Sequence, residues 1–323
     1  MTQPLQRLAA HDHSHALKNL QEFLNFPLLT MGRICVIIPA EGVNFLRIFQ
    51  DILRILDTSM ETPTAYGWFH ILSLLLTAGF TVFLCLRYKN SSQAQIRHMV
   101  LAVAVVVLVL EIYKQINYSF SYDNGIVFDY QWYAFPFQFC STPMYIGLLA
   151  GLSKKGRVHD AACAYLATYA IFAGICVMVY PNDVFISTVG INIQTMICHG
   201  TMISVGVCLL YTGYVQLKHR TILKAVAVFA ACLLAAVIMN EIAHLTGLLE
   251  RETFNMFFIS PYCEPSLPVY SLVQAVVPFP FCLIIYILGF SLAVYLMLLA
   301  AMGIQALAAK RRHPASALVA YHA

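Results

Sequence analysis

Charged residues are scarce in this sequence. Asp, Glu, Lys and Arg make up 11% of the 323 residues, whereas hydrophobic residues make up 60%. Soluble globular domains carry about 25% charged residues, so this composition excludes an ordinary soluble domain and indicates an integral membrane protein. The formal net charge is +4. Because the basic residues cluster beside apolar segments, this excess indicates membrane topology and not nucleic-acid binding.

Signals of several other functions are absent as well. The sequence has no internal repeat, no glycine-rich phosphate loop and no nucleic-acid motif. Residues 27–40 are interrupted by Arg33 and lack a basic leader followed by a clean apolar core, so they do not predict a signal peptide. No disulfide framework is indicated, because most of the ten cysteines fall inside apolar segments. These are Cys85, Cys140, Cys163, Cys176, Cys198, Cys208, Cys232 and Cys282. Cys35 and Cys263 lie outside those segments and could pair only if both face an oxidising side.

Long apolar segments begin at residue 66. Seven of them are long enough for a helix that crosses a bilayer, which takes about 20 residues. They cover residues 66–86, 98–117, 134–152, 161–180, 191–214, 222–245 and 277–302. The sequence therefore predicts an all-α fold, a polytopic membrane helix bundle with seven transmembrane helices.

The loops at the two ends of these segments differ in charge. The loops at one end carry the basic residues Arg87, Lys89, Arg97, Lys154, Lys155, Arg157, Lys218, Arg220, Lys224, Lys310, Arg311 and Arg312. The opposite loops carry Asp123, Asp129, Asp183, Glu250, Glu252 and Glu264, with Arg251 as their only basic residue. Because basic loops stay in the cytoplasm, we expect the N-terminus outside and the C-terminus inside.

Three regions are expected along the chain. Residues 1–59 form an N-terminal extension in which Phe45, Phe49, Leu53 and Leu56 recur at the spacing of an amphipathic, membrane-surface helix. Residues 60–303 form the transmembrane domain, and residues 304–323 a basic cytoplasmic tail. The charged extension would have to cross the membrane without a signal peptide, and Met60 directly precedes the first span. This suggests that the extension is not native and that translation begins at Met60.

The longest outer connection, residues 247–275, is rich in aromatic residues and proline. A loop this apolar is expected to lie at the membrane interface or to fold over the mouth of the bundle. It is a candidate lid.

Polar residues inside the expected spans share one depth, the outer third of the membrane. They are His70, Glu111, Lys114, Gln115, Cys140, His199, Asn240, Glu241 and His244. Buried charges in a membrane cost several kcal/mol unless they are paired or solvated, so we expect Glu111, Lys114 and Glu241 to face a polar cavity or one another. Glu111 and Lys114 lie three residues apart and could equally form a structural ion pair.

Cys140 and His199 are the candidates for covalent chemistry. The stretch 131–151 predicts a helix that contains Cys140, with Pro143 loosening it beside the thiol. His199 lies on another span at a matching depth. A thiol needs a base to become a nucleophilic thiolate near neutral pH, and imidazole is the usual base. The alternative is that Cys140 is a small buried hydrophobe, which is common for cysteine.

Three segments carry a resemblance to a known family. They are YGWFHIL at 66–72, FPFQFC at 135–140 and CHG at 198–200. Over roughly residues 60–302 the chain resembles the YwaF-type integral membrane proteins. The resemblance implies relation to a eukaryotic branch of transmembrane lipid acyltransferases, in which a cysteine and a histidine on two helices move an acyl chain between glycerophospholipids. Those positions correspond to Cys140 and His199.

The leading hypothesis is therefore a membrane-embedded Cys/His lipid acyltransferase or lipid hydrolase that works through a thiol acyl-enzyme, without a cofactor. Glu241 or Glu111 would orient His199, and Lys114, Gln115 or Gln138 would stabilise the oxyanion. Asn240 and His244, which share the outer end of the sixth span with Glu241, are further candidates for supporting residues of this site. We expect membrane lipids as partners, glycerophospholipid or lysolipid, no nucleic acid, and a multi-pass location in a bacterial plasma membrane.

Two other functions fit the same residues. A zinc-dependent lipid hydrolase would use His70, His199 and His244 as ligands of a metal-bound water. A seven-helix transporter or receptor would instead bind a small solute in an outer polar pocket through Glu111, Lys114 and Glu241.

Overall fold

The computed structural model describes residues 42–121, 126–250, 252–264 and 267–312. Within these ranges the chain is almost entirely helical. The helices are α2 (Gly42–Leu56), α3 (Trp68–Tyr88), α4 (Gln93–Asn117), α5 (Thr142–Leu152), α6 (Arg157–Tyr165), α7 (Ile171–Val179), α8 (Val189–Tyr211), α9 (His219–Leu245), α10 (Pro268–Gln274) and α11 (Phe279–Arg312). Short 3-10 turns cover Trp132–Ala134, Leu248–Glu250 and Met256–Phe258, and one π-helical turn covers Leu166–Ala170. Two short strands, β1 (Phe120–Ser121) and β2 (Val127–Phe128), pair antiparallel. The predicted all-α membrane helix bundle is confirmed.

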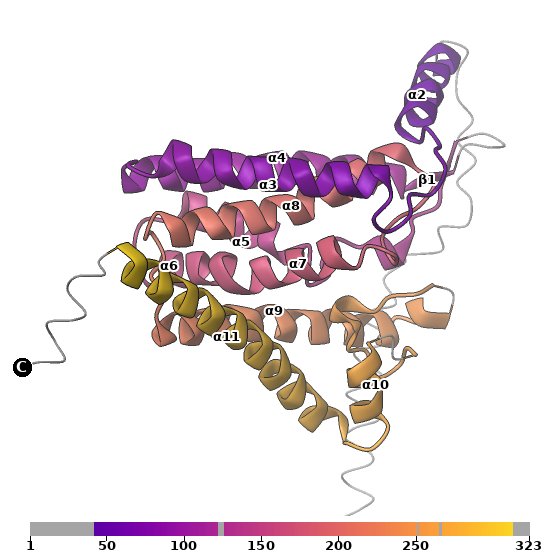
Figure 1. Cartoon of the computed structure of the whole chain (residues 1–323). Helices are drawn as coiled ribbons and strands as arrows, with labels where there is room; N and C mark the ends of the chain where they lie inside the picture. The colour runs from indigo at the N-terminus through magenta and orange to yellow at the C-terminus, as the bar shows by residue number, and fades with distance from the viewer. Residues whose placement is uncertain (1–41, 122–125, 251, 265–266, 313–323) are drawn as a thin grey trace, which may run out of the picture.

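Most of the long helices lie side by side, whereas α11 crosses the bundle obliquely (Figure 1). In the part of the chain that the structure describes, six helices are long and apolar enough to cross a membrane. They are Trp68–Tyr88, Gln93–Asn117, Arg157–Val179, Val189–Tyr211, His219–Leu245 and Phe279–Leu307. Most residues of the continuous helix Arg157–Val179 and of α8 are buried, whereas most residues of α3, α4, α9 and α11 are not. The bundle is thus built around α6, α7 and α8.

The third expected span differs from the expectation. Only Thr142–Leu152 is helical there, and its 11 residues are too few to count among the six membrane-length helices. Residues 135–141 form an irregular, largely covered segment. Non-helical backbone at membrane depth is tolerated where protein covers it, and α5 packs closely against α4 and α6.

The expectation that Cys140 lies inside a helix is wrong. Cys140 lies in a turn, two residues before α5 begins at Thr142. The physical reason is Pro143, which occupies the first turn of α5. Proline is favoured there because the first N–H groups of a helix have no intrahelical partner anyway. Pro143 therefore starts the helix after the thiol and does not kink a helix around it.

The segment before the first span is attached to the bundle. The Met60 N–H donates to the Ser187 carbonyl at 2.7 Å, and the Val189 N–H donates to the Thr58 carbonyl at 2.9 Å. The Tyr113 hydroxyl donates to the carbonyl at the end of α2 at 2.6 Å. These contacts fix the chain beside the start of α8, and α2 stands beyond that end of the bundle (Figure 1). Residues 1–41, which include Cys35, and the end of the tail lie outside the described residues.

Candidate functional site

A polar cavity of about 240 Å³ lies between α4, the turn before α5 and α8. Its polar lining comprises Glu111, Lys114, Tyr118, Tyr133, Cys140, Ser141, Asp183, Gln194, Thr195, Cys198 and His199. Four residues singled out from the sequence are therefore brought to one cavity: Glu111, Lys114, Cys140 and His199. They come from three separate segments of the chain, and Cys140 and His199 share this lining.

His199 is buried and has one unpaired ring nitrogen. Its Nδ1 lies 2.7 Å from the Thr195 carbonyl oxygen. Because a carbonyl only accepts, Nδ1 carries the proton and Nε2 presents a lone pair. Nε2 is buried and has no hydrogen-bond partner among the residues that the structure describes. Buried polar atoms are nearly always paired, and an exception calls for an explanation. The free lone pair of Nε2 is therefore the feature of His199 that structural packing does not explain.

Cys140 is held at the N-terminal end of α5. The Thr142 hydroxyl donates to the Phe139 carbonyl at 2.8 Å, and this fixes the turn that contains the thiol. The Tyr165 hydroxyl lies 2.6 Å from the Thr142 hydroxyl and ties the turn to α6. These two contacts fix the turn that contains Cys140 beside α5 and α6.

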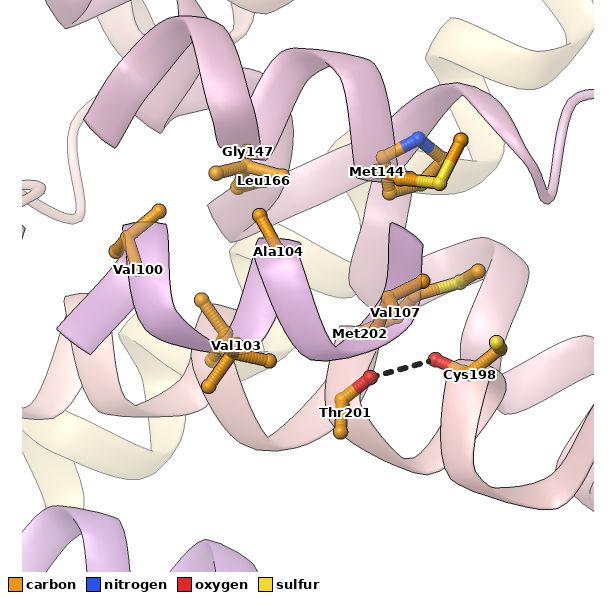
Figure 2. Close-up of a pocket in the computed structure, with 12 residues that line it drawn as sticks. Val100, Val103, Ala104, Val107, Met144, Gly147, Leu166, Cys198, Thr201 and Met202 are labelled. Carbon is orange, nitrogen blue, oxygen red and sulfur yellow. Dashed lines mark hydrogen bonds between the residues drawn. The ribbon is translucent and has the colours of Figure 1, made fainter. Parts of the chain in front are cut away.

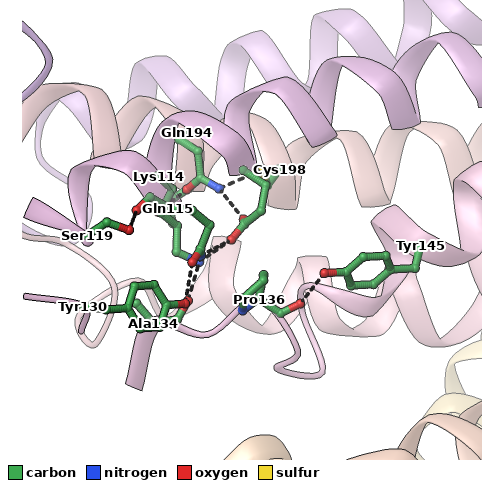
Figure 3. A network of polar contacts seen from close by, with 11 residues as sticks. Lys114, Gln115, Ser119, Tyr130, Ala134, Pro136, Tyr145, Gln194 and Cys198 are labelled. Atoms are coloured by element: carbon green, nitrogen blue, oxygen red, sulfur yellow. Dashed lines mark hydrogen bonds and ion pairs between the residues drawn. The ribbon is translucent and has the colours of Figure 1, made fainter. Parts of the chain in front are cut away.

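Glu111 accepts hydrogen bonds from Lys114, Gln115 and Gln194, and these three partners lie close together in Figure 3. Its Oε1 accepts from Lys114 Nζ at 3.0 Å and from Gln115 Nε2 at 2.8 Å. Its Oε2 accepts from Gln194 Nε2 at 3.2 Å. Glu111 and Lys114 therefore form an ion pair on one face of α4, and Gln194 joins that pair to α8.

Gln115 is fixed by further contacts at the rim of the cavity. Its Nε2 also donates to the Ala134 carbonyl at 2.9 Å, and its Oε1 accepts from the Tyr130 hydroxyl at 2.6 Å. Burial, with a smaller contribution from the carboxylate of Glu111, raises the pKa of Tyr130 to about 12. Tyr130 therefore stays protonated and donates at any physiological pH.

Gln138 and Asn240 bind the outer loop. Gln138 Nε2 donates to the Asn255 carbonyl at 2.9 Å, and its Oε1 accepts from the Phe257 N–H at 2.9 Å. Asn240 makes the same pair of bonds with the N–H and C=O of Met256, at 2.8 and 3.0 Å. Phe257 has a φ of 59°, which is uncommon for a residue other than glycine. Two side-chain amides thus hold this strained loop segment against the bundle.

Glu241 and His244 lie together elsewhere. The Tyr262 hydroxyl donates to Glu241 Oε2 at 2.9 Å, and the Tyr262 ring stacks on the imidazole of His244 with 3.6 Å between centroids. Neither residue is among those that line the polar cavity. Their contacts join the end of α9 to the outer loop.

The alternative zinc site is not assembled. Both ring nitrogens of His70 are engaged: Nδ1 accepts from the Tyr66 N–H at 2.8 Å, and Nε2 donates to the Met178 carbonyl at 2.9 Å. His244 is stacked on its tyrosine and His199 faces the cavity. Across the described ranges, no three His, Cys, Asp or Glu residues are placed to hold one metal ion.

Several residues of the cavity and its hydrogen-bond network went unrecognised in the sequence, among them Gln194, Tyr130 and Asp183. Gln194 lies on α8 one residue before Thr195 and is buried, so an uncharged amide inside an apolar span was a signal that could have been used. Tyr130 and Asp183 lie in connections, where tyrosine and aspartate are ordinary. Only the fold brings them to α4 and α8.

Comparison with known proteins adds one match. A model of the TMEM164 family matches residues 65–300. No curated protein and no solved structure gives a significant match. The matched range begins just before α3 and ends within α11, so it contains every residue of the polar cavity.

Proposed function

The chain belongs to the TMEM164 family of transmembrane proteins, and we propose that it is a lipid acyltransferase or lipid hydrolase with Cys140 as its nucleophile. One observation carries the proposal. His199, whose buried Nε2 has no partner among the described residues, and Cys140 are both among the residues that line one cavity. A thiol and an imidazole with a free nitrogen are the two groups that covalent acyl transfer needs. The resemblance to YwaF-type proteins assigns the same two positions.

The reaction would proceed in two halves. His199 Nε2 takes the proton of Cys140 Sγ, and the thiolate attacks the ester carbonyl of a glycerophospholipid. A thioester forms, the ester C–O bond breaks, and the imidazolium returns its proton to the departing alkoxide, which leaves as a lysolipid hydroxyl. In the second half, His199 deprotonates the hydroxyl of another lysolipid or a water molecule. That oxygen attacks the thioester, and the Cys140 thiol is regenerated with the proton from His199.

The surroundings support these roles in different ways. The backbone carbonyl of Thr195 orients His199 through Nδ1, so that no carboxylate is required for this purpose. Lys114 and the N-terminus of α5 provide positive charge for the developing oxyanion. Glu111 accepts from Lys114, Gln115 and Gln194, and Gln138 has both ends of its amide bonded to the outer loop. In the proposal, Glu111 and Gln138 act by holding the cavity wall and the loop.

The proposed substrate follows from the location. Phospholipid ester groups lie just beneath the headgroups, and the charge of the loops predicts that Cys140 lies in the outer third of the bilayer, at a similar depth. The partners would be glycerophospholipid and lysolipid of a bacterial plasma membrane. The thiol mechanism needs no metal or other cofactor.

Reaction with a lipid-like electrophile tests the proposal. Protein in phospholipid vesicles is treated with a long-chain N-alkyl iodoacetamide, and the alkylated cysteines are identified by peptide mass spectrometry. We expect Cys140 to react fastest, and His199→Ala to slow that reaction selectively. Cys198→Ala is the matched control, because Cys198 lines the same cavity and should leave the labelling of Cys140 unchanged. Equal labelling of Cys140 with and without His199 would sink the proposal.

A second function is favoured by the charges of the cavity. Lys114, Glu111 and Asp183 line it together, an arrangement that suits a small polar solute bound by a receptor or transporter. In that case function would depend on Lys114 and Glu111 and would be indifferent to Cys140→Ala. Solute binding measured by thermal stabilisation of the two sets of variants separates the two functions.

A further inference from the structure

One segment of the outer loop, residues 255–257, is held by side chains from three other parts of the chain and is termed the strap here. Its partners are Gln138, Asn240 of α9 and Tyr286 of α11, and the five hydrogen bonds to the strap backbone measure 2.8–3.0 Å. Hydrogen bonds are directional. Together they fix the strap against two helices and against the segment that precedes α5.

The backbone at the strap is strained. Phe257 has a φ of 59° and Phe258 a φ of 57°, a left-handed conformation that residues other than glycine rarely adopt. Such residues persist where the surrounding contacts hold them firmly. Here the Phe257 ring is fully buried, and its centroid lies 6.2 Å from that of Phe137 and 5.9 Å from that of Phe139. The strap is therefore seated on the residues that lead into Cys140.

Gln138 joins the strap to the turn that contains Cys140. Both ends of its side-chain amide are bonded to the strap. Its backbone carbonyl accepts from the N–H groups of Ser141 and Thr142, at 2.8 and 3.2 Å, and these bonds close the turn around the thiol. A displacement of Gln138 is therefore transmitted to Cys140.

The helix on the other side of Cys140 is fixed without the strap. A Cβ added at Gly147 of α5 would lie 3.0 Å from Ala104 Cβ of α4, so the two helices are in close contact, and the two residues are neighbours in Figure 2. The Thr142 hydroxyl is bonded to Tyr165 of the next helix. One side of the turn is thus held by α4 and α6, and the other side by the strap.

The strap is not placed as a lid over the polar cavity. In the described part of the chain, the cavity lining includes Cys140 and Ser141 but no residue of the strap. A lid lines the cavity that it closes. The contacts of the strap are instead with residues 137–139, so the strap acts on the position of the thiol and not on access to it.

We propose that Gln138 is a positioning residue for Cys140. With its amide bonded to the strap, Gln138 sets where the thiol lies relative to His199. The inference rests on the proposed function, in which Cys140 Sγ gives its proton to His199. Asn240 and Tyr286 belong to the same device, because they hold the strap from α9 and α11.

Alkylation of Cys140 in variants with a loosened strap tests the proposal. The full chain in phospholipid vesicles is treated with the long-chain N-alkyl iodoacetamide. Gln138→Leu and Asn240→Leu each lose two bonds to the strap. Each should slow the alkylation at least about tenfold, because a misplacement of about 1 Å can cost about 100-fold in rate. Unchanged rates would overturn the proposal, and faster alkylation would overturn it as well, since the strap would then shield the thiol.

Tyr262→Phe is the matched control. It removes a hydrogen bond between the same loop and Glu241 of α9 without touching the strap, and the alkylation rate should stay at the wild-type value. A slower reaction in this variant would mean that any loosening of the loop affects Cys140, and the specific role of Gln138 would be lost.

A double variant separates positioning from general loosening of the fold. If Gln138 acts by placing the thiol at His199, Gln138→Leu should have little further effect in a His199→Ala protein. Loss by the same factor in both backgrounds would overturn the positioning role. If Gln138→Leu does not fold, as judged by thermal unfolding, Tyr286→Phe removes a single bond to the strap and takes its place in the comparison.

Amide hydrogen exchange distinguishes failure of the strap from failure of the proposed function. A peptide spanning residues 137–145 should exchange about tenfold faster in Asn240→Leu, as expected for the loss of two hydrogen bonds. Faster exchange, with alkylation that is indifferent to His199, would refute the enzyme and retain the coupling of strap and turn. Alkylation that depends on His199, with exchange and alkylation unchanged in the strap variants, would refute the strap and retain the enzyme.

Discussion

Two cysteine and histidine pairs lie at the two ends of α5, and they differ in every respect that matters for chemistry. At the end opposite Cys140, Cys163 Sγ lies 3.5 Å from His159 Nε2. His159 Nδ1 donates to the Ala150 carbonyl at 2.9 Å, and its Nε2 accepts from the Tyr214 hydroxyl at 2.7 Å. Neither Cys163 nor His159 lines the polar cavity. Cys140 and His199 both line it, and one ring nitrogen of His199 has no partner among the described residues.

The comparison teaches that proximity alone does not make a catalytic pair. His159 and Cys163 are four residues apart on one helix and are in contact, yet every polar atom of that imidazole is satisfied. Such an arrangement stabilises the junction of α5, α6 and the end of α8. Cys140 and His199 are 59 residues apart in sequence; they differ from the other pair in the unpaired Nε2 of His199 and in lining one cavity, and the proposed function rests on these two differences.

The largest difference in acyl transfer is expected between the Cys140 and Cys163 variants. Cys140→Ala should reduce acyl transfer at least about 1,000-fold, because the covalent intermediate cannot form, whereas Cys163→Ala should leave it near the wild-type rate. The measurement is exchange of an isotopically labelled acyl chain between phospholipid and lysolipid in vesicles, followed by mass spectrometry. If Cys140→Ala and Cys163→Ala lost acyl transfer to a similar extent, the two pairs would not differ in function.

Replacing His199 and replacing His159 should affect different properties: the reactivity of Cys140 in the first case and the stability of the protein in the second. His199→Gln should slow alkylation of Cys140 by about 100-fold, since general-base assistance is worth about 10² to 10⁴ in rate. The melting temperature should change little, because Nε2 has no partner to lose among the described residues. The alkylation rate and a thermal unfolding curve in detergent check both parts. An unchanged rate would remove His199 from the mechanism.

His159→Leu should behave in the opposite way. It leaves the buried Ala150 carbonyl and the Tyr214 hydroxyl without their partner, and a buried polar group deprived of its hydrogen bond costs about 1–3 kcal/mol. We expect a lower melting temperature and normal alkylation of Cys140. A reduced alkylation rate at temperatures where the variant is folded would mean that the two ends of α5 are coupled.

The smallest effect is expected from Tyr214→Phe. This change removes the hydrogen bond from Tyr214 to His159 Nε2, worth about 1 kcal/mol, and leaves the Cys163 thiol as the partner of that nitrogen. The variant therefore gives Cys163 a histidine lone pair of its own without supplying a cavity. We expect Cys163 to stay unreactive toward the alkyl iodoacetamide. If it becomes reactive, the free lone pair, and not access, is what distinguishes the two pairs.

Local features of the site could be predicted from the sequence. Glu111 and Lys114 are three residues apart on a helix, and their ion pair follows from that spacing. The contact of Gln194 with Glu111 spans 83 positions, and no periodicity predicts it. Gln138 illustrates the same limit: its position two residues before Cys140 suggested oxyanion stabilisation, while its bonds go to Asn255 and Phe257 of the outer loop.

The break in the third span was harder to predict. Residues 134–152 are apolar throughout, so hydropathy assigns them to one membrane-crossing helix. Hydropathy is insensitive to where helical hydrogen bonding begins, and Pro143 is compatible with a helix start as well as with a kink. The contacts of residues 135–139 with the outer loop and with Phe229 of α9 cover the irregular backbone.

The sequence by itself determined that this protein is a membrane helix bundle with polar groups gathered near one end. The free energy of transferring a segment into the bilayer is a sum over its own residues, so it can be calculated from the sequence alone. Only the tertiary structure decided which of those groups meet, since hydrogen bonds are satisfied by partners from distant segments. In the folded protein, both ring nitrogens of His70 and His159 have hydrogen-bond partners, and both ends of the Gln138 amide are bonded. Nε2 of His199 has no partner among the described residues, and His199 lines the cavity that Cys140 also lines.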